Sequence, residues 1–170
     1  MPLVDKAPSS GEPHGGEGNQ SLWNPKVRRL YEYWRSIHPE TGLPGRQHFE
    51  PLDIPDLLST LWLLDVQHEP FRLRYRLVGT KIVERLGREV TGQWLDEAHS
   101  NVANDPTYFD RYRLVVTQKE PSWRKGRPIF KQDTHVAVLE NLILPLAADG
   151  ETVNTLLIIT IRYTEDGREY

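Results

Sequence analysis

The 170-residue sequence contains no cysteine. This absence excludes disulfides, thiolate metal sites, cysteine nucleophiles and chromophores attached through a thiol. Disulfides belong mainly to oxidising compartments, so a chain without cysteine is compatible with a reducing one. We therefore expect a cytoplasmic protein.

Long apolar runs are also missing. A membrane-spanning helix needs roughly 20 consecutive apolar residues, whereas the longest run in this chain, residues 156–161, suits a buried strand. The N-terminal sequence MPLVDKAPSSGEPHGGEGNQS lacks the basic start and the apolar segment of a secretory signal. We expect neither secretion nor a membrane partner.

Strong net charge and enzyme signatures are absent as well. The formal net charge is −3 at pH 7, so no overall field attracts nucleic acid. The sequence contains no phosphate-binding loop, no Gly-x-Gly-x-x-Gly, no Gly-x-Ser-x-Gly and no His-Glu-x-x-His. These absences favour a protein that is not an enzyme.

Clusters of titratable residues are weak candidates for chemistry. Asp96, Glu97 and His99 lie close together, but a polar loop is the better interpretation because no further metal ligand can be identified. An enzyme or small-molecule carrier that uses an α+β cavity remains an alternative. Its only candidates are Glu140, which has core-facing parity in a predicted strand, and His135 beside it.

Composition divides the chain into three parts. Residues 1–21 are rich in Pro, Gly, Ser and Glu, which predicts a disordered tail. Residues 22–164 are long enough for a single domain with its own core, and residues 165–170 form a polar tail.

An amphipathic helix is predicted over residues 25–38. Asn24 followed by Pro25 is typical of a helix start, with Asn as the N-cap. Apolar side chains then recur at helical spacing and form an aromatic-rich stripe of Val27, Leu30, Tyr31 and Trp34.

Strands and short helices follow. A hairpin is predicted from residues 61–66 and 71–78, a short helix from residue 79 to Gly87, and a longer helix over 106–118. Three further strands are predicted over 122–130, 135–146 and 153–163. The last strand is apolar on both alternating sets, so it should be central and covered on both faces. This order indicates an α+β fold in which short helices cover one sheet face and the N-terminal helix covers the other.

One strand carries three arginines, Arg72, Arg74 and Arg76, alternating with apolar residues. Such a row could contact phosphates, which leaves a nucleic-acid-binding accessory protein as an alternative function. Single-strand binders, however, place aromatic rings on the same face, and Tyr75 has the opposite parity. We favour the outer face of an edge strand whose arginines pair with acidic neighbours.

Aromatic residues concentrate in the middle of the chain. They either fill the core or line a small-ligand cavity between the sheet and the helices. The positions concerned are Trp62, Tyr75, Trp94, Tyr108, Tyr112 and Trp123.

Four segments together resemble a bacterial subfamily of single PAS-type domains of largely uncharacterised function. They are LYEYWRSIHPETGLP, RQHFEPLDIP, LWLLDV and YRLVGTKIVERLGREVTG. The likeness covers residues 25–163, and none of its motifs is catalytic. It implies a five-stranded antiparallel sheet, short helices on one face that enclose a possible ligand cavity, and a role in sensing or protein interaction.

The resemblance also implies partners and cofactors. We expect a homodimer formed through Val27, Leu30, Tyr31 and Trp34, with an unknown signalling protein as the further partner. A small ligand would bind among Trp62, Tyr75, Leu77, Trp94, Tyr108, Tyr112 and Leu144. Cysteinyl flavin adducts and thioester chromophores are disfavoured because the chain lacks cysteine, and haem is disfavoured because residues 106–118 contain no histidine. The ligand itself stays unknown.

Overall fold

The computed structural model describes residues 20–99, 102, 104–128 and 135–170. The predicted disordered tail of residues 1–21 lies outside this part, except for Gln20 and Ser21. These two belong to the 3-10 helix η1 (Gln20–Leu22). Among the helices of the described ranges, none has both the length and the apolar character needed to span a bilayer.

Helix α1 (Pro25–Ser36) begins where the sequence predicts. The Asn24 side chain accepts a hydrogen bond from the Lys26 backbone nitrogen at 2.9 Å, and Pro25 takes the first helical position. Val27 and Leu30 are fully buried, and Trp34 is 5% exposed. Burial of each such side chain contributes roughly 1.5–3 kcal/mol. The amphipathic helix is therefore confirmed, although it ends before residue 38.

A five-stranded antiparallel sheet forms the centre of the molecule. Its strands are β1 (Leu61–Gln67), β2 (Arg72–Val78), β3 (Ser122–Gly126), β4 (Val138–Leu146) and β5 (Thr155–Tyr163), in the spatial order β2-β1-β5-β4-β3. Strand β5 lies between β1 and β4 and is buried along most of its length. The predicted α+β class and the central position of the last strand are confirmed.

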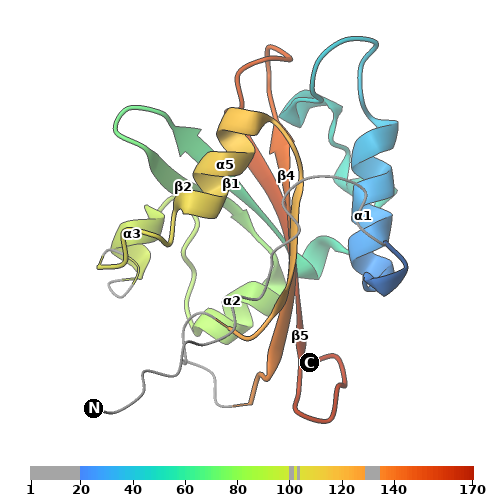
Figure 1. The fold of residues 1–170 in the computed structure, drawn as a ribbon, viewed down its shortest axis with the longest axis vertical. Coiled ribbons are helices and arrows are strands. Elements are labelled where there is room, and N and C mark those ends of the chain that lie inside the picture. Colours follow the sequence, from blue (N-terminus) through green and yellow to red (C-terminus); the bar gives the residue numbers. More distant parts are fainter. Residues whose placement is uncertain (1–19, 100–101, 103, 129–134) are drawn as a thin grey trace, which may run out of the picture.

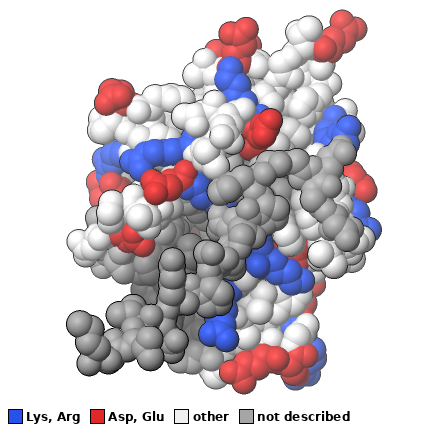
Figure 2. Space-filling view, viewed as in Figure 1, with Lys and Arg blue, Asp and Glu red and all other residues white. Residues whose placement is uncertain are grey.

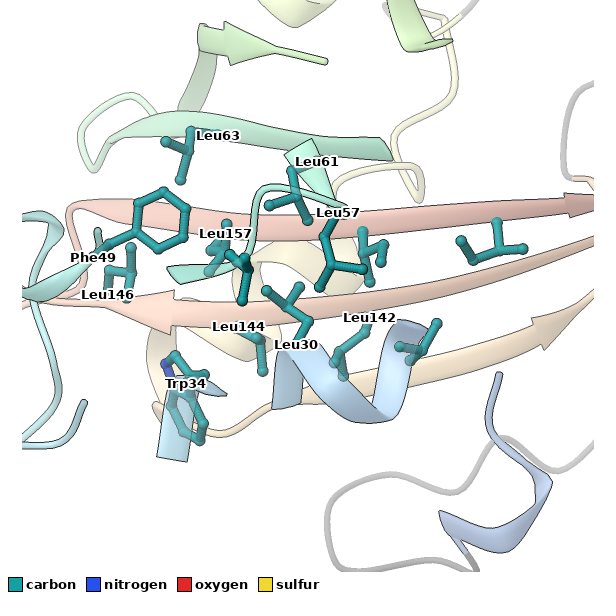
Figure 3. Packing of buried hydrophobic residues seen from close by; sticks show 14 of the residues in the cluster. Leu30, Trp34, Phe49, Leu57, Leu61, Leu63, Leu142, Leu144, Leu146 and Leu157 are labelled. Carbon is teal, nitrogen blue, oxygen red and sulfur yellow. The ribbon is translucent and has the colours of Figure 1, made fainter. Parts of the chain in front are cut away.

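Two hydrophobic clusters lie on opposite faces of this sheet (Figure 1). The α1 face is the side covered by α1 and by the segment with the 3-10 helices η2 (Arg46–His48), η3 (Pro51–Asp53) and η4 (Leu58–Thr60). The α5 face is the side covered by α3 (Leu95–Ala98) and α5 (Asp110–Gln118). In Figure 3, Leu30 and Trp34 of α1 lie over Leu142 and Leu144 of β4. The N-terminal helix thus covers the second face, as predicted.

An irregularity in β2 changes which side chains share a face. Leu63 pairs with Leu77, but the next residue of β1, Leu64, pairs with Tyr75. Arg76 is therefore an extra residue, as in a β-bulge. Because side chains alternate along a strand, this insertion puts Tyr75 on the α5 face and Leu77 on the α1 face.

Glycines flank the short helix α2 (Thr80–Leu86), as the sequence predicts. Gly79 approaches the 3-10 helix η4 so closely that a Cβ atom would lie 2.4 Å from the Ser59 carbonyl oxygen. Gly87 ends the helix with φ of 68°, a left-handed conformation that suits glycine. The chain can therefore turn directly from β2 into α2.

Three segments differ from the prediction. Helix α5 begins at Asp110, because Asp105 accepts hydrogen bonds from the Thr107 backbone and hydroxyl and holds a turn there. The β3–β4 pair is shorter than predicted, with β3 ending at Gly126 and β4 beginning at Val138. The polar C-terminal residues fold back, so that Glu169 pairs with Tyr163 and forms an ion pair with Lys26 of α1.

Candidate functional site

Four of the predicted aromatic residues meet on the α5 face. Trp62, Tyr75, Tyr108 and Tyr112 all belong to the cluster beneath α3 and α5. Ring centroids are 5.9 Å apart for Trp62 and Tyr75, and 5.8 Å apart for Tyr108 and Tyr112. Burial raises the pKa of each of the three phenols, so they stay protonated and can donate hydrogen bonds at neutral pH. These residues make a largely apolar layer that still carries polar groups.

A histidine joins this layer to α3. The Tyr75 hydroxyl lies 2.8 Å from Nε2 of His99. Burial lowers the pKa of His99, and the nearby Arg88 and Arg85 lower it further. In a neutral imidazole one ring nitrogen donates and the other accepts, so the tautomer of His99 sets the direction of this hydrogen bond. The backbone of Tyr75 is held by the same segment, since its amide donates to the Gln93 carbonyl and its carbonyl accepts from Gly92.

Polar side chains form a connected row across the same face. The Trp62 indole donates to the Thr160 hydroxyl at 3.1 Å, and the Asn141 amide donates to that hydroxyl at 2.9 Å. Arg111 of α5 donates to the Asn141 side-chain oxygen at 2.7 Å and to the Ser122 hydroxyl at 2.8 Å. The row thus runs from β1 through β5 and β4 to β3, on the same sheet face as the aromatic rings.

Three of the predicted cavity residues lie elsewhere. Leu77 and Leu144 pack in the cluster on the α1 face. Leu77 is displaced by the bulge at Arg76, whereas Leu144 shares the parity of Leu142, which faces α1. Trp94 lies at the edge of the sheet, where its backbone pairs with Arg74. The expected grouping of these three residues with the aromatic layer is therefore wrong.

Two of the three arginines of β2, Arg72 and Arg74, pair with acidic neighbours, as the favoured interpretation predicts. Arg72 donates two hydrogen bonds to Asp96 and one to Glu97, and these contacts raise the pKa of Arg72. Its guanidinium lies 4.3 Å from the Trp94 ring centroid. Arg74 pairs with Asp65 at 3.4 Å. On the visible face of the molecule, Figure 2 shows basic and acidic side chains interspersed, so the charges form no row for phosphates there.

The possible metal ligands have other partners. Asp96 and Glu97 both bind Arg72, which lowers the pKa of Asp96, while His99 contacts Tyr75. In the described residues, no group of three or more metal-ligating side chains comes together. Asp96 and Glu97 thus belong to helix α3 rather than to the predicted polar loop, and both pair with Arg72.

The expected dimer residues are mostly occupied within the chain. Val27, Leu30 and Trp34 pack against the sheet, and the Trp34 indole donates to the Pro145 carbonyl at 3.0 Å. Tyr31 is half-buried and, with Trp34, Arg35 and His38, lines an open hollow of about 370 Å³ on the flank of α1. Only this flank, and not the whole stripe, reaches the surface.

The sequence predicts that Glu140 faces the core, but it does not predict the residues that Glu140 contacts. The residue is fully buried, yet it lies on the α1 face and contacts Asn24, Trp123, Tyr163 and Lys125. His135 is exposed. The polar row was missed, although Asn141 and Thr160 do stand at positions of one parity inside otherwise apolar strands. Polar residues at these strand positions are the sequence signal that could have predicted the polar row.

Comparison with known proteins identifies the family of this chain. No curated protein matches the chain significantly. One solved structure, an RNA-binding light-oxygen-voltage receptor, aligns with 91% of this chain and 38% of its own, at 17% identity and a TM-score of 0.49. A model of the PAS domain family matches residues 23–160, which is most of the described part of the chain. The chain therefore belongs to the PAS domain family.

Proposed function

We propose that this PAS domain is a non-enzymatic sensor or protein-interaction module in bacterial signalling, and that a small ligand binds on the α5 face. The observation that carries the proposal is the polar row from Trp62 to Arg111, which shares a sheet face with a layer of aromatic rings. Ligand sites are typically apolar with a few placed polar groups, which is the composition of this face.

The side chains indicate what kind of ligand would fit. The buried phenols of the aromatic layer stay protonated, so a ligand with oxygen acceptors on a planar or apolar body would complement them. Thiol-linked flavin and thioester chromophores cannot form without cysteine. Helix α5 carries no histidine for haem, and His99 is already bonded to Tyr75.

Native mass spectrometry tests the proposal. The purified full chain is incubated with a small-molecule extract of bacterial cells, and a retained mass is identified and then titrated. Replacing Tyr75 by Phe removes one buried phenol and should weaken binding about tenfold, the usual effect of losing a single hydrogen bond. Tyr33→Phe is the matched control, because its phenol lies on the α1 side near Glu50 and Asp53 and should leave affinity unchanged.

Two results would contradict ligand binding on this face. One is the absence of any retained or titratable small molecule in a correctly folded preparation. The other is a ligand whose affinity is the same in Tyr75→Phe and wild type but falls in Tyr33→Phe. The first result leaves a pure protein-interaction role for the domain, and the second would place the ligand on the α1 side.

The homodimer is a separate part of the proposal. Since Val27, Leu30 and Trp34 already pack on the chain's own sheet, the contact would use the exposed flank of α1 around Tyr31 and Arg35. Light scattering should give twice the chain mass for wild type and the single-chain mass for Tyr31→Glu. Arg113→Glu, on the far side of the sheet, serves as the control. A monomeric wild type rejects the dimer.

A further inference from the structure

Glu140 is a fully buried carboxylate whose two oxygens are both occupied. Oε1 accepts from the Asn24 backbone nitrogen at 2.7 Å and from the Trp123 indole at 3.1 Å. Oε2 accepts from the Tyr163 hydroxyl at 2.7 Å and lies 3.3 Å from Nζ of Lys125. A buried carboxylate is tolerated only when it is bonded in this way. One side chain of β4 therefore joins β3, β5 and the start of α1.

The contact with α1 completes a helix cap from another element. In a capping box, a residue of the first turn reaches back to the backbone N–H of the N-cap residue. Here Asn24 is the N-cap, and Glu140 accepts from its N–H across 116 positions of sequence. The negative charge also lies at the positive end of the helix dipole. The placement of the first turn of α1 thus depends on the position of β4.

Arg111 binds the same two strands from the α5 face. We call the contacts of Glu140 and those of Arg111 the two clamps. Arg111 donates to the Ser122 hydroxyl and carbonyl of β3, and to the side chain and carbonyl of Asn141 in β4. Ser122 precedes Trp123, and Asn141 follows Glu140, in the sequence. Because successive side chains of a strand point to opposite faces, the two clamps contact adjacent residues from opposite faces of the sheet.

We propose that the β3–β4 pair is a mechanical link between α5 and α1, with Arg111 and Glu140 as its two positioning residues. In the described part of the sheet, β3 is an edge strand that pairs with β4 alone, so it can shift more easily than the central strands. A displacement of Ser122 and Asn141 by α5 moves Trp123 and Glu140 with them. The N-cap of α1 then loses its bond to Glu140.

This inference deepens the proposed function, because it names the route from the α5 face to α1, but its test needs no ligand. The measurement is amide hydrogen exchange in the full chain. Arg111→Met keeps the length of the side chain and removes its hydrogen bonds. Exchange in α1 should then become about three- to tenfold faster, the size expected for residues along a coupling network. Amides of β1, which neither clamp touches, should keep their rates.

Arg113→Met is the matched control on the same helix. Its side chain is half-exposed, pairs with Asp110 and lies over the Phe71 ring, so in the described part of the chain its contacts are not with β3 or β4. It should leave α1 exchange within a factor of about two of wild type, the scatter expected for a surface substitution. Faster exchange in α1 for both variants alike would mean general destabilisation and would reject the link.

The double variant decides whether the two clamps act together. Glu140→Gln alone should speed α1 exchange about tenfold, because it loses the ion pair and weakens the cap. Adding Arg111→Met should then have less effect than it has alone, since the transmitting bond is already weakened. Additive effects, or an Arg111→Met variant with normal α1 exchange, would overturn the proposal.

A reciprocal measurement covers the case in which those variants do not fold. Coupling between two sites is mutual, so Lys125→Met on the α1 face should speed exchange in α5. Unchanged α5 exchange in that variant would also overturn the link. Ligand retention is read separately by mass spectrometry, so a protein with a working link and no ligand rejects only the proposed function.

Discussion

The two faces of the sheet differ in their polar groups rather than in their aromatic content. On the α1 face, Trp23 stacks on Trp123 with centroids 5.6 Å apart, and Trp34 is 5% exposed. The fully buried charged side chain there is Glu140, which is enclosed by its partners. On the α5 face, a row of polar side chains extends across four strands beside the aromatic residues.

This difference shows why counting aromatic residues does not locate a site. A layer of rings and leucines in which the polar groups serve only as a cap is typical of permanent packing. A layer whose polar groups form a row under the rings is typical of ligand sites. The α1 face therefore stabilises the fold, while the α5 face is where we place the ligand.

The largest effect on stability is expected at Leu144, which lies fully buried on the α1 face. Replacing it by Ala should lower the free energy of unfolding by about 2–5 kcal/mol, because the removed atoms leave a cavity in a tightly packed layer. Denaturant unfolding measures this loss. Ligand affinity should stay unchanged under conditions in which the variant is folded.

Leu52→Ala is the control for that experiment. Leu52 is 79% exposed, so its truncation should change stability by no more than about 0.5 kcal/mol. If Leu144→Ala instead weakened ligand binding at near-normal stability, Leu144 would belong to the site and the assignment of the two faces would be wrong.

A medium effect is expected at the cap of α1. Asn24→Ala removes the acceptor for the Lys26 amide and the donor to the Tyr163 hydroxyl, and should cost about 1–2 kcal/mol. Asn24→Gly keeps a favourable N-cap backbone and should recover part of this loss. Thermal unfolding of both variants measures the difference, and equal stability of Asn24→Ala and wild type would show that α1 is held by its apolar stripe alone.

The sequence predicts the elements of this fold well, because the relevant signals are local. Asn24-Pro25 marks the start of α1, Gly87 ends α2, and the doubly apolar β5 lies at the centre. The sequence predicts that the helix starts at residue 106, whereas α5 starts at Asp110. A turn held by Asp105 resembles a helix start in sequence. Local signals identify the kind of capping residue, but not which of two neighbouring turns begins the helix.

The candidate site is predicted less well, because its geometry depends on long-range register. Strict alternation along β2 puts Leu77 beside Tyr75, and only the pairing with β1 reveals the extra residue Arg76. Glu140 has the correct core-facing parity, but its partners Asn24 and Tyr163 are distant in sequence. Strand pairing and helix docking decide these contacts, and neither leaves a periodic signal in the chain.

A pH dependence should separate the α5 face from the α1 face. The pKa of His99 is lowered by burial and by Arg88 and Arg85, so the unfolded chain binds the proton more readily than the folded one. Stability should therefore be unaffected above the ordinary histidine pKa of about 6.5 and should fall as the pH drops below it. His99→Gln should flatten this slope in pH-dependent thermal unfolding, whereas His68→Gln, in an exposed turn, should keep it. An unchanged slope in His99→Gln would show that another group titrates.

The smallest effect on the free energy of unfolding is expected at the edge of the sheet, outside the two hydrophobic clusters. Arg74 pairs with Asp65 at 3.4 Å, and the two side chains are 45% and 30% exposed. Arg74→Gln should change the free energy of unfolding by less than about 0.5 kcal/mol, because solvent screens such a pair. Arg72→Gln should cost more, since it loses contacts with Asp96 and Glu97 and lies closer to the Trp94 ring. Urea unfolding at low and high salt compares the two variants. If Arg74→Gln were the costlier, the Trp94 edge would depend on a different contact from the one that the geometry indicates.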